Sequence, residues 1–171
     1  EKLGTPKQTV TSTSGYMSVL SDQAAIDAIL MSYAGLRNKR LVELCQRHGI
    51  NAVGLTGLDG RVVQGERNKG IRLRENNKNI IKRDFSGKAR SVNAPLLKLL
   101  LDNGYTPVLT IPIADEHGYA VNSENDDIVN ALQVALQATT VIQLIEAGGF
   151  LADASDPDSV LPTMSIAEVA Q

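Results

Sequence analysis

Residues 105–127 place a buried strand, a polar turn and the start of a helix next to one another. Val108–Ile113 is an apolar, mostly β-branched run, as in a strand buried in a parallel sheet. Ile128–Leu136 repeats apolar residues at helical spacing. The polar residues between them can cap a helix, orient a substrate or position a cation: Asn122, Ser123, Glu124, Asn125, Asp126 and Asp127. The alternative is that these residues only cap the helix, with more polar groups than a cap needs.

The composition predicts one core and excludes several classes of site. The 171 residues are 43% hydrophobic, which suits a single domain or one large piece of a bigger domain. A net charge of -2 argues against a protein that binds nucleic acid over its whole surface. Two His and one Cys leave little for a zinc site or a disulfide framework. The printed sequence has no secretory leader, and its apolar runs are short, so we expect a cytoplasmic protein without a membrane segment.

Helical periodicity predicts two helices before the polar turn. The first covers residues 23–48 and ends at Gly49, a residue that commonly follows a helix. Its apolar stripe consists of Ala25, Ile29, Met31, Leu36, Leu41 and Leu44. The second covers residues 95–103, with Pro95 in its first turn and Gly104 after its end, which is the usual asymmetry of helix ends.

Strand patterns alternate with these helices. We expect strands at Asn51–Thr56, Arg61–Gln64, Ile71–Glu75, Asn79–Arg83, Pro107–Ile113 and Thr140–Ile145, and a last helix from Ser165. This order predicts an α/β fold, a three-layer αβα sandwich with a mostly parallel sheet and protruding β-hairpins. Parallel sheets bind ligands beyond the carboxyl ends of their strands. We therefore expect one cleft, formed by the turns at residues 56–60, 114–127 and 146–149.

Residues 61–90 are strongly basic. They contain ten Lys or Arg residues and three acidic residues, a local excess of seven positive charges. Hairpins of one charge attract a partner of the opposite charge, although Lys and Arg also keep exposed strand edges soluble. We favour an acidic macromolecular partner. Nucleic-acid binding is a less favoured alternative and predicts an affinity that falls steeply with salt.

Six motifs occur in an order that resembles a known family. They are V-T-S-T-S-G-Y-M-S (10–18), A-G-L-R-N-K-R-L-V-E-L (34–44), G-L-T-G-L-D-G (54–60), K-R-D-F-S-G-K (82–88), V-N-A-P-L-L-K-L-L-L-D-N-G-Y-T-P-V (92–108) and A-V-N-S-E (120–124). Together they resemble the amino-acid kinase family. Within it they are most similar to the acetylglutamate kinase-like enzymes, and closest to the aminoadipate and glutamate kinases whose substrate is tethered to an acidic carrier protein in lysine and arginine biosynthesis.

The resemblance implies a fold and an activity. It implies that residues 1–171 are part of one amino-acid kinase-like domain that lacks both ends, with a basic hairpin excursion at residues 61–92. The implied activity is ATP-dependent phosphorylation of a side-chain carboxylate of an N-blocked, acetylated or carrier-linked glutamate or aminoadipate, which gives an acyl phosphate. Magnesium would be the metal and a homodimer the assembly. The two substrates differ by one methylene, so the choice between them stays open.

The same resemblance implies roles for individual residues. Asn122 would hold the substrate, and Glu124 would occupy the place of a catalytic, organising aspartate. The turn residues Gly57 and Asp59 would shape the substrate side of the cleft. Glu146 and Gly149 would lie on the nucleotide side. The charge excess assigns Arg72, Arg74 and Lys82 to carrier binding, and no residue is assigned to a metal.

Three positions depart from the family pattern. Val19 stands where an arginine usually grips the substrate carboxylate, so Arg37 or Lys39 would have to replace that cation. Glu124 replaces an aspartate, and Ile145-Glu146 replaces a Thr/Ser-Asp pair. Small shifts in a preorganised site lower rates strongly. The alternative function is therefore a catalytically weakened, kinase-like binding or regulatory protein that holds an acidic partner protein.

Overall fold

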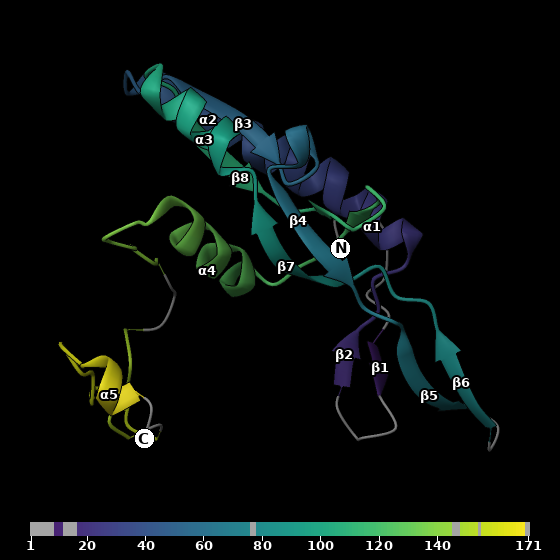
Figure 1. The fold of residues 1–171 in the computed structure, drawn as a ribbon. Coiled ribbons are helices and arrows are strands. Elements are labelled where there is room, and N and C mark those ends of the chain that lie inside the picture. The colour runs from purple at the N-terminus through teal and green to yellow at the C-terminus, as the bar shows by residue number, and fades with distance from the viewer. Residues whose placement is uncertain (1–8, 12–16, 76–77, 145–147, 154, 170–171) are drawn as a thin grey trace. The chain divides into compact units, whose positions relative to one another are not determined.

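The computed structural model describes residues 9–11, 17–75, 78–144, 148–153 and 155–169 (Figure 1). For residues 9–11, 17–19, 72–75, 78–79, 166 and 169 the description is limited to the backbone. The chain divides into two compact units, Glu1–Ala138 and Thr139–Gln171. The candidate substrate and partner residues all belong to the first unit.

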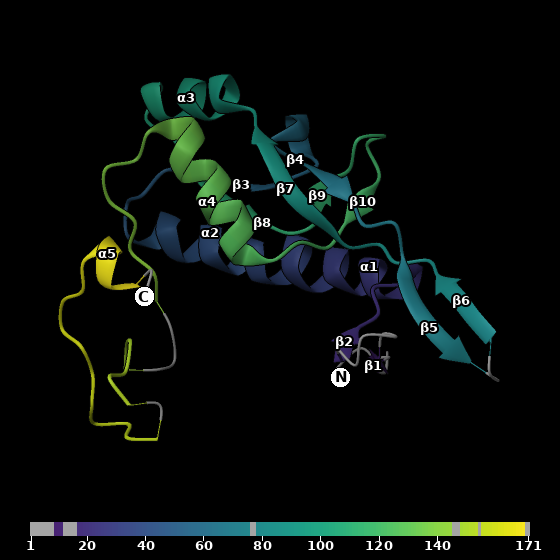
Figure 2. The ribbon, with the colours of Figure 1, turned by 60° about the horizontal axis from the view of Figure 1, so that its bottom comes forward.

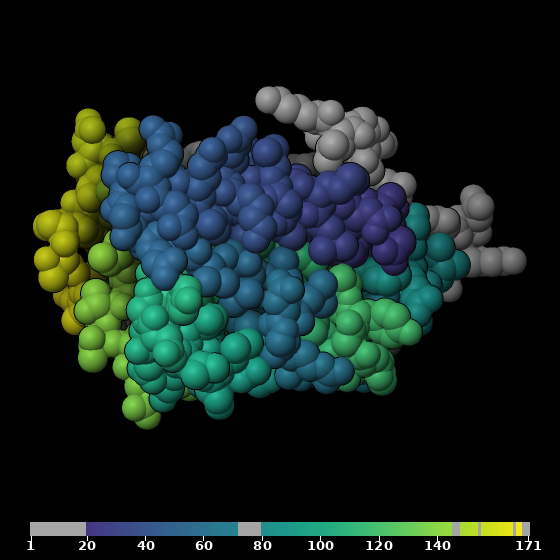
Figure 3. Space-filling view, turned by 90° about the horizontal axis from the view of Figure 1, so that it is seen from above, coloured from purple at the N-terminus to yellow at the C-terminus, as the bar shows by residue number. Residues whose placement is uncertain are grey.

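The first unit contains one long helix, at residues 23–47. It is continuous from α1 (Gln23–Ile29) through the π-helical segment η1 (Leu30–Arg37) to α2 (Asn38–Arg47). The Asp22 carboxylate accepts a hydrogen bond from the Ala25 amide at 2.8 Å and caps its first turn. Gly49, with φ of 74°, follows its end. The prediction for residues 23–48 is confirmed, and Figure 3 shows the helix as a continuous purple-to-blue band.

The apolar stripe predicted for this helix is mostly exposed. Met31, Leu36, Leu41 and Leu44 are between 48% and 59% exposed. The buried positions are instead Ile26 and the polar Asn38. The periodicity located the helix correctly, but it did not identify the side chains that pack inside this unit.

Strands β3 (Ala52–Thr56) and β8 (Thr106–Thr110) form a parallel pair. Asn38 of α2 fixes the pair to the helix, because its amide nitrogen donates to the Val108 carbonyl at 2.8 Å and to the Leu55 carbonyl at 3.5 Å. In this register Thr56 pairs with Thr110. The two strands therefore end at the same edge, as predicted.

The predicted strand over residues 107–113 is wrong as a single element. It is interrupted at Pro112, after which Ile113–Ala114 forms the short strand β9 in a different sheet. Proline has no amide hydrogen to donate to a ladder, so the chain leaves β3 at this point. The interruption moves Ile113 into the core of the second sheet.

The second sheet has the strand order β10-β9-β4-β7. Its members are β4 (Val63–Arg67), β7 (Gly87–Val92), β9, and β10 (Ala120–Val121). The β4–β9 pair is parallel and the other two pairs are antiparallel. The strand predicted at residues 61–64 begins two residues later, because the 3-10 turn η2 (Asp59–Arg61) precedes it. Strand β7 was not predicted.

Two antiparallel hairpins complete the strands of the first unit. They are β1 (Thr9–Thr11) with β2 (Met17–Val19), and β5 (Ile71–Glu75) with β6 (Lys78–Lys82). Figures 1 and 2 show β5 and β6 extending beyond the ends of β4 and β7. The strand predicted at residues 71–75 is confirmed, and the one predicted at residues 79–83 is shifted by one residue.

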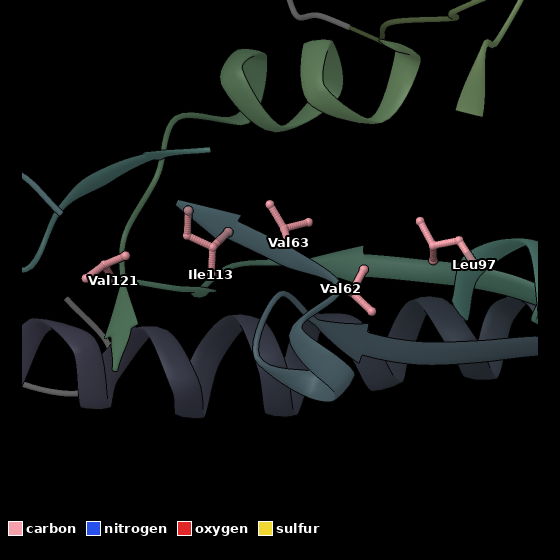
Figure 4. Packing of buried hydrophobic residues seen from close by; sticks show 5 residues of the cluster. All are labelled: Val62, Val63, Leu97, Ile113 and Val121. Carbon is pink, nitrogen blue, oxygen red and sulfur yellow. The ribbon is translucent and has the colours of Figure 1, made fainter. Parts of the chain in front are cut away.

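Helices α3 (Ala94–Asp102) and α4 (Asn125–Leu136) complete the unit. Asn93 caps α3 by accepting the Leu96 amide at 3.2 Å, and both helices match their predictions. The buried core consists of Val62, Val63, Leu97, Ile113 and Val121 (Figure 4). Ile128, Leu132 and Leu136 of α4 pack against it. The core thus lies directly behind the polar turn at the start of α4.

The second unit contains little regular structure in its described residues. Residues 140–144 are not a strand, so the strand predicted at 140–145 is wrong over this range, and residue 145 lies outside the described residues. Ile142 and Leu144 are 83% and 94% exposed. Within this unit no described strand pairs with them, and an apolar run needs such a neighbour to become a strand. The helix expected from Ser165 is present as α5 (Ile166–Val169).

None of the helices that the structure describes combines the length and the apolar composition needed to cross a bilayer.

Candidate functional site

The turns after β3 and β8 meet at one edge of the first unit. The Gly57 amide donates to the Thr110 carbonyl at 3.2 Å. Ile113, three residues further along the chain, pairs with Val121 across β9 and β10. Asn122 follows directly. The structure therefore brings two of the three predicted turns, residues 56–60 and 114–127, to the same edge.

Gly57 has a packing role at this edge. It is buried, and a Cβ atom at this position would lie 2.7 Å from the Ile113 Cα. Contacts that short do not occur between real side chains and backbone, so glycine is required for the close approach of the two turns. This packing accounts for the glycine. Its predicted contact with substrate remains a prediction.

Asp59 closes the turn that follows β3. One carboxylate oxygen accepts both the Thr56 amide at 2.7 Å and the Thr56 hydroxyl at 2.9 Å. The side chain is otherwise at the surface. Asp59 therefore holds the shape of the turn, and its role in substrate binding also remains a prediction.

Asn122 is held by its backbone and leaves its side chain available. Its amide donates to the Phe85 carbonyl, and its carbonyl accepts the Gly87 amide, both at 2.8 Å. The residue is half-buried, and its side chain forms no hydrogen bond with any described residue. The alternative that Asn122 caps the following helix is wrong, because Glu124 is the cap residue of α4.

Glu124 and Ser123 add two further polar groups beside Asn122. Glu124 is exposed and its carboxylate forms no capping bond, although a negative charge is favourable at the positive end of a helix. Ser123 is only 7% exposed, and its buried hydroxyl has no hydrogen-bond partner among the described residues. This edge thus presents an amide, a carboxylate and a hydroxyl whose hydrogen bonds are not used by the described fold.

Asp84 organises this edge and was missed as a site residue. It is 3% exposed. One of its oxygens accepts the buried Ser21 amide at 3.0 Å, and the other accepts the Ser86 hydroxyl. Ser86 in turn pairs with Asn122 in an isolated parallel bridge. The signal was present in the motif K-R-D-F-S-G-K, where an aspartate stands between an aromatic residue and a basic pair.

A pocket of about 290 Å³ lies where β4, β5 and β6 meet the loop between β9 and β10. Its lining contains three of the basic residues counted in the sequence, together with two carboxylates and a histidine. The lining residues are Arg67, Asn68, Lys69, Gly70, Arg83, Asp84, Glu116 and His117. We call it the Arg67 pocket.

Two arginines of the Arg67 pocket stack on one aromatic ring. The Arg67 guanidinium lies 4.0 Å from the centre of the Phe85 ring, and that of Arg83 lies 5.6 Å from it. The Arg67 Nε donates to the Asp84 carbonyl at 3.1 Å. Backbone amides of Glu116 itself and of Arg67 lower the pKa of the Glu116 carboxyl, so this residue is ionised at neutral pH.

The remaining predicted cations are only partly described. Lys82 is half-buried at the end of β6. Arg72 and Arg74 belong to β5, but their side chains lie outside the described residues. Lys39, one of the two candidates to replace the missing substrate arginine, donates to the Gly54 carbonyl at 3.2 Å. Arg37, the other candidate, is exposed.

The structure describes one of the two residues predicted for the nucleotide side. Glu146 lies outside the described residues. Gly149 belongs to the second unit, and a Cβ atom there would lie 3.2 Å from a methyl group of Val160. No group of three or more His, Cys, Asp or Glu that could hold a metal ion occurs among the residues that the structure describes.

Comparison with known proteins identifies the family. The sequence pattern of the amino acid kinase family matches residues 2–171. The chain belongs to the amino acid kinase family. The resemblance inferred from the six motifs is thereby confirmed.

Three relatives show which members of the amino acid kinase family are similar to this chain. The LysW-aminoadipate kinase of Deinococcus radiodurans is 42% identical over 94% of this chain and 56% of its own length. That of Thermus thermophilus is 38% identical over 99% of this chain and 63% of its own length. The acetylglutamate kinase of Methanopyrus kandleri is 34% identical over 83% of this chain and 56% of its own length. The chain thus spans less than two thirds of each of these relatives.

A solved structure confirms the fold class. The crystal structure of smu.665 from Streptococcus mutans superposes with a TM-score of 0.70 and covers 90% of this chain and 57% of its own. The sequences are 17% identical, so this similarity concerns the fold. The α/β class with parallel strand pairs and packed helices is confirmed.

Proposed function

We propose that this protein uses ATP to phosphorylate a side-chain carboxylate of an N-blocked glutamate or aminoadipate, giving an acyl phosphate. The observation that supports this most strongly is the similarity of nearly the whole chain to two LysW-aminoadipate kinases, at 42% and 38% identity. The tethering of the substrate to a carrier protein, and the pathway to lysine or arginine, are parts of the same proposal.

The site edge suits this chemistry. A substrate carboxylate is already ionised at neutral pH, so it attacks the phosphoryl group without a general base. Phosphoryl transfer then depends on positioning and on cations that stabilise the developing charge. In the proposal the Asn122 amide holds the amide or carboxylate end of the substrate. Glu124 is the catalytic carboxylate that orients the other groups, which its exposed and unbonded position allows.

Magnesium would reach this site with the nucleotide. Mg²⁺ usually keeps few protein ligands and is bound mainly by substrate phosphates and water. We assign it no protein ligand. When bound, Mg²⁺ neutralises charge on the phosphate oxygens, and Glu146 and Gly149 stay proposed nucleotide contacts.

The proposed partner is an acidic carrier protein. The local excess of seven positive charges in residues 61–90 supports this partner, and Arg72, Arg74 and Lys82 are the proposed contacts. A homodimeric assembly in the cytoplasm completes the proposal.

Binding of magnesium-ATP tests the proposal cheaply. A ligand that binds only the folded state adds about 2.7 kcal/mol of stability at a concentration one hundred times its Kd. We therefore expect a melting temperature several degrees higher with magnesium-ATP than with magnesium chloride alone. The measurement is thermal unfolding of the full-length protein by differential scanning fluorimetry.

The alternative function predicts a different result. A kinase-like protein that holds an acidic partner without turnover would show equal melting temperatures with magnesium-ATP and magnesium chloride. The departures at Val19, Glu124 and Glu146 favour this outcome. Equal melting temperatures would therefore count against the kinase proposal and in favour of the binding protein.

A further inference from the structure

We infer that Ser86 and Asp84 are positioning residues for the substrate, and that they act through the backbone of Asn122. This inference rests on the proposed function, because it requires Asn122 to hold the substrate. It adds to that function a pair of side chains that does not touch the substrate. The pair sets where the Asn122 side chain lies at the site edge.

The backbone of Asn122 is fixed by the segment that contains Ser86. The Phe85 carbonyl accepts the Asn122 amide at 2.8 Å, and the Gly87 amide donates to the Asn122 carbonyl at 2.8 Å. Ser86 is the bridge partner of Asn122 in this arrangement. The Asn122 side chain itself forms no hydrogen bond with any described residue. Its position therefore depends on the backbone bonds to residues 85–87.

The Ser86 hydroxyl is fixed in one direction. The Asn68 side-chain amide donates to it at 2.6 Å, and the Asn68 backbone amide donates to the Ser86 carbonyl at 2.9 Å. A serine hydroxyl has one hydrogen to donate, and here it donates to the Asp84 carboxylate. Ser86 thus links the residue after β4 to a buried carboxylate, and both its side chain and its carbonyl are held.

Asp84 ties this segment to the start of the long helix. It is 3% exposed, and its other oxygen accepts the Ser21 amide at 3.0 Å. The Phe85 amide donates to the Ser21 carbonyl at 2.7 Å. Ser21 is buried and lies two residues after Val19, where the family resemblance implies a contact with the substrate carboxylate. One carboxylate therefore holds both segments to which the resemblance assigns substrate contacts.

The bonds of Asp84 favour positioning over charge pairing. The ion pairs formed within the described part of the chain are Arg40 with Glu43 and Arg90 with Glu66, and neither includes Asp84. A buried carboxylate without a cation is costly unless well-aligned hydrogen bonds satisfy it. Such bonds are directional, so they fix the carboxylate and its donors in one geometry. A phosphoryl-transfer site depends on fixed geometry of this kind.

Removal of the Ser86 hydroxyl tests this inference in the full-length protein. We expect Ser86→Ala to raise the KM for carrier-linked aminoadipate about threefold to tenfold, because part of the free energy of a lost hydrogen bond reaches Asn122. The kcat should change less than about twofold. Ser86→Thr keeps a hydroxyl, so its KM should stay within about twofold of the wild-type value. Steady-state kinetics and urea denaturation are measured for each variant.

Ser91→Ala is the matched control. It is the same replacement at an exposed position of β7, the strand that begins directly after Ser86. Its KM should equal the wild-type value.

A double-mutant cycle tests whether Ser86 acts through Asn122. If it does, adding Ser86→Ala to Asn122→Ala should change KM by less than about twofold, because the side chain that Ser86 positions is already absent. Residues that act independently would multiply their effects on KM instead. A purely structural role of Ser86 would lower the free energy of unfolding in both backgrounds and leave the KM effects independent.

Several results would overturn the inference. They are a KM for Ser86→Ala no higher than that of Ser91→Ala, a Ser86→Thr variant as impaired as Ser86→Ala, and effects of Ser86→Ala and Asn122→Ala that multiply in full. Unfolding of Ser86→Ala would also overturn it, because Ser86 would then serve stability.

The wild-type protein separates this inference from the proposed function. If it transfers no phosphoryl group to an N-blocked substrate, the proposed function fails and the inference fails with it. If it transfers the group and Ser86→Ala leaves KM unchanged, only the positioning role fails.

Discussion

Asp84→Ala is expected to lower the free energy of unfolding by about 3 kcal/mol, since hydrogen bonds to charged groups contribute about 1.5–3 kcal/mol each. The substitution leaves the buried Ser21 amide and the Ser86 hydroxyl without their acceptor. It also loosens the segment that pairs with Asn122. Urea denaturation followed by circular dichroism measures the change.

Two variants control this prediction. Asp84→Asn keeps an oxygen that can accept the Ser21 amide, so its free energy of unfolding should fall clearly less than that of Asp84→Ala. Asp102→Ala removes an exposed carboxylate from the last turn of α3, where a negative charge is unfavourable, and should change stability by less than about 0.5 kcal/mol. If Asp84→Ala lowers the free energy of unfolding no more than Asp102→Ala does, Asp84 does not organise the site edge.

Asn122→Ala is expected to raise the KM for the N-blocked substrate about tenfold to a hundredfold, as the loss of a hydrogen bond to a charged group predicts. The free energy of unfolding should change by less than about 1 kcal/mol, because the side chain bonds to no described residue. Steady-state kinetics with acetylated or carrier-linked substrate, combined with urea denaturation, separate the two effects.

Asn130→Ala provides the matched control for Asn122→Ala. Asn130 is exposed in the middle of α4, away from the turn that precedes this helix. Its replacement should leave KM within twofold of the wild-type value. An unchanged KM for Asn122→Ala, or its unfolding, would assign Asn122 a structural role instead.

The sequence predicted those elements whose signal is local. The helices at residues 23–48 and 95–103 carry their own caps and stop signals, and the structure has both. The turns after β3 and β8 were expected at one edge because parallel strands end together, and the pairing of Thr56 with Thr110 confirms it. The same argument about the ends of parallel strands predicted that Asn122 lies at this edge.

The features that were missed depend on contacts between distant segments. The strand predicted at residues 107–113 is split between two sheets, since Ile113 pairs with Val121 instead of continuing along β3. Asp84 owes its role to Ser21, which lies 63 positions earlier in the chain. The periodicity of a short stretch of sequence cannot indicate such a distant partner. The Arg67 pocket was missed for the same reason, because its lining comes from three separate segments.

The run at residues 140–144 was predicted as a strand and is not one. Its composition fits a strand, but the second unit supplies no described strand beside it, and Leu144 is 94% exposed. A strand is stabilised by its neighbours rather than by its own residues. Apolar composition alone was therefore an insufficient basis for predicting this element.

Transfer of a labelled γ-phosphate from ATP to carrier-linked aminoadipate tests the central claim most directly. With the full-length protein and magnesium, we predict label on the carrier in a form that hydroxylamine releases, as an acyl phosphate requires. Omitting magnesium should abolish the transfer. The absence of label above the magnesium-free control, with folded protein that still binds the carrier, would contradict the account and favour a binding protein without kinase activity.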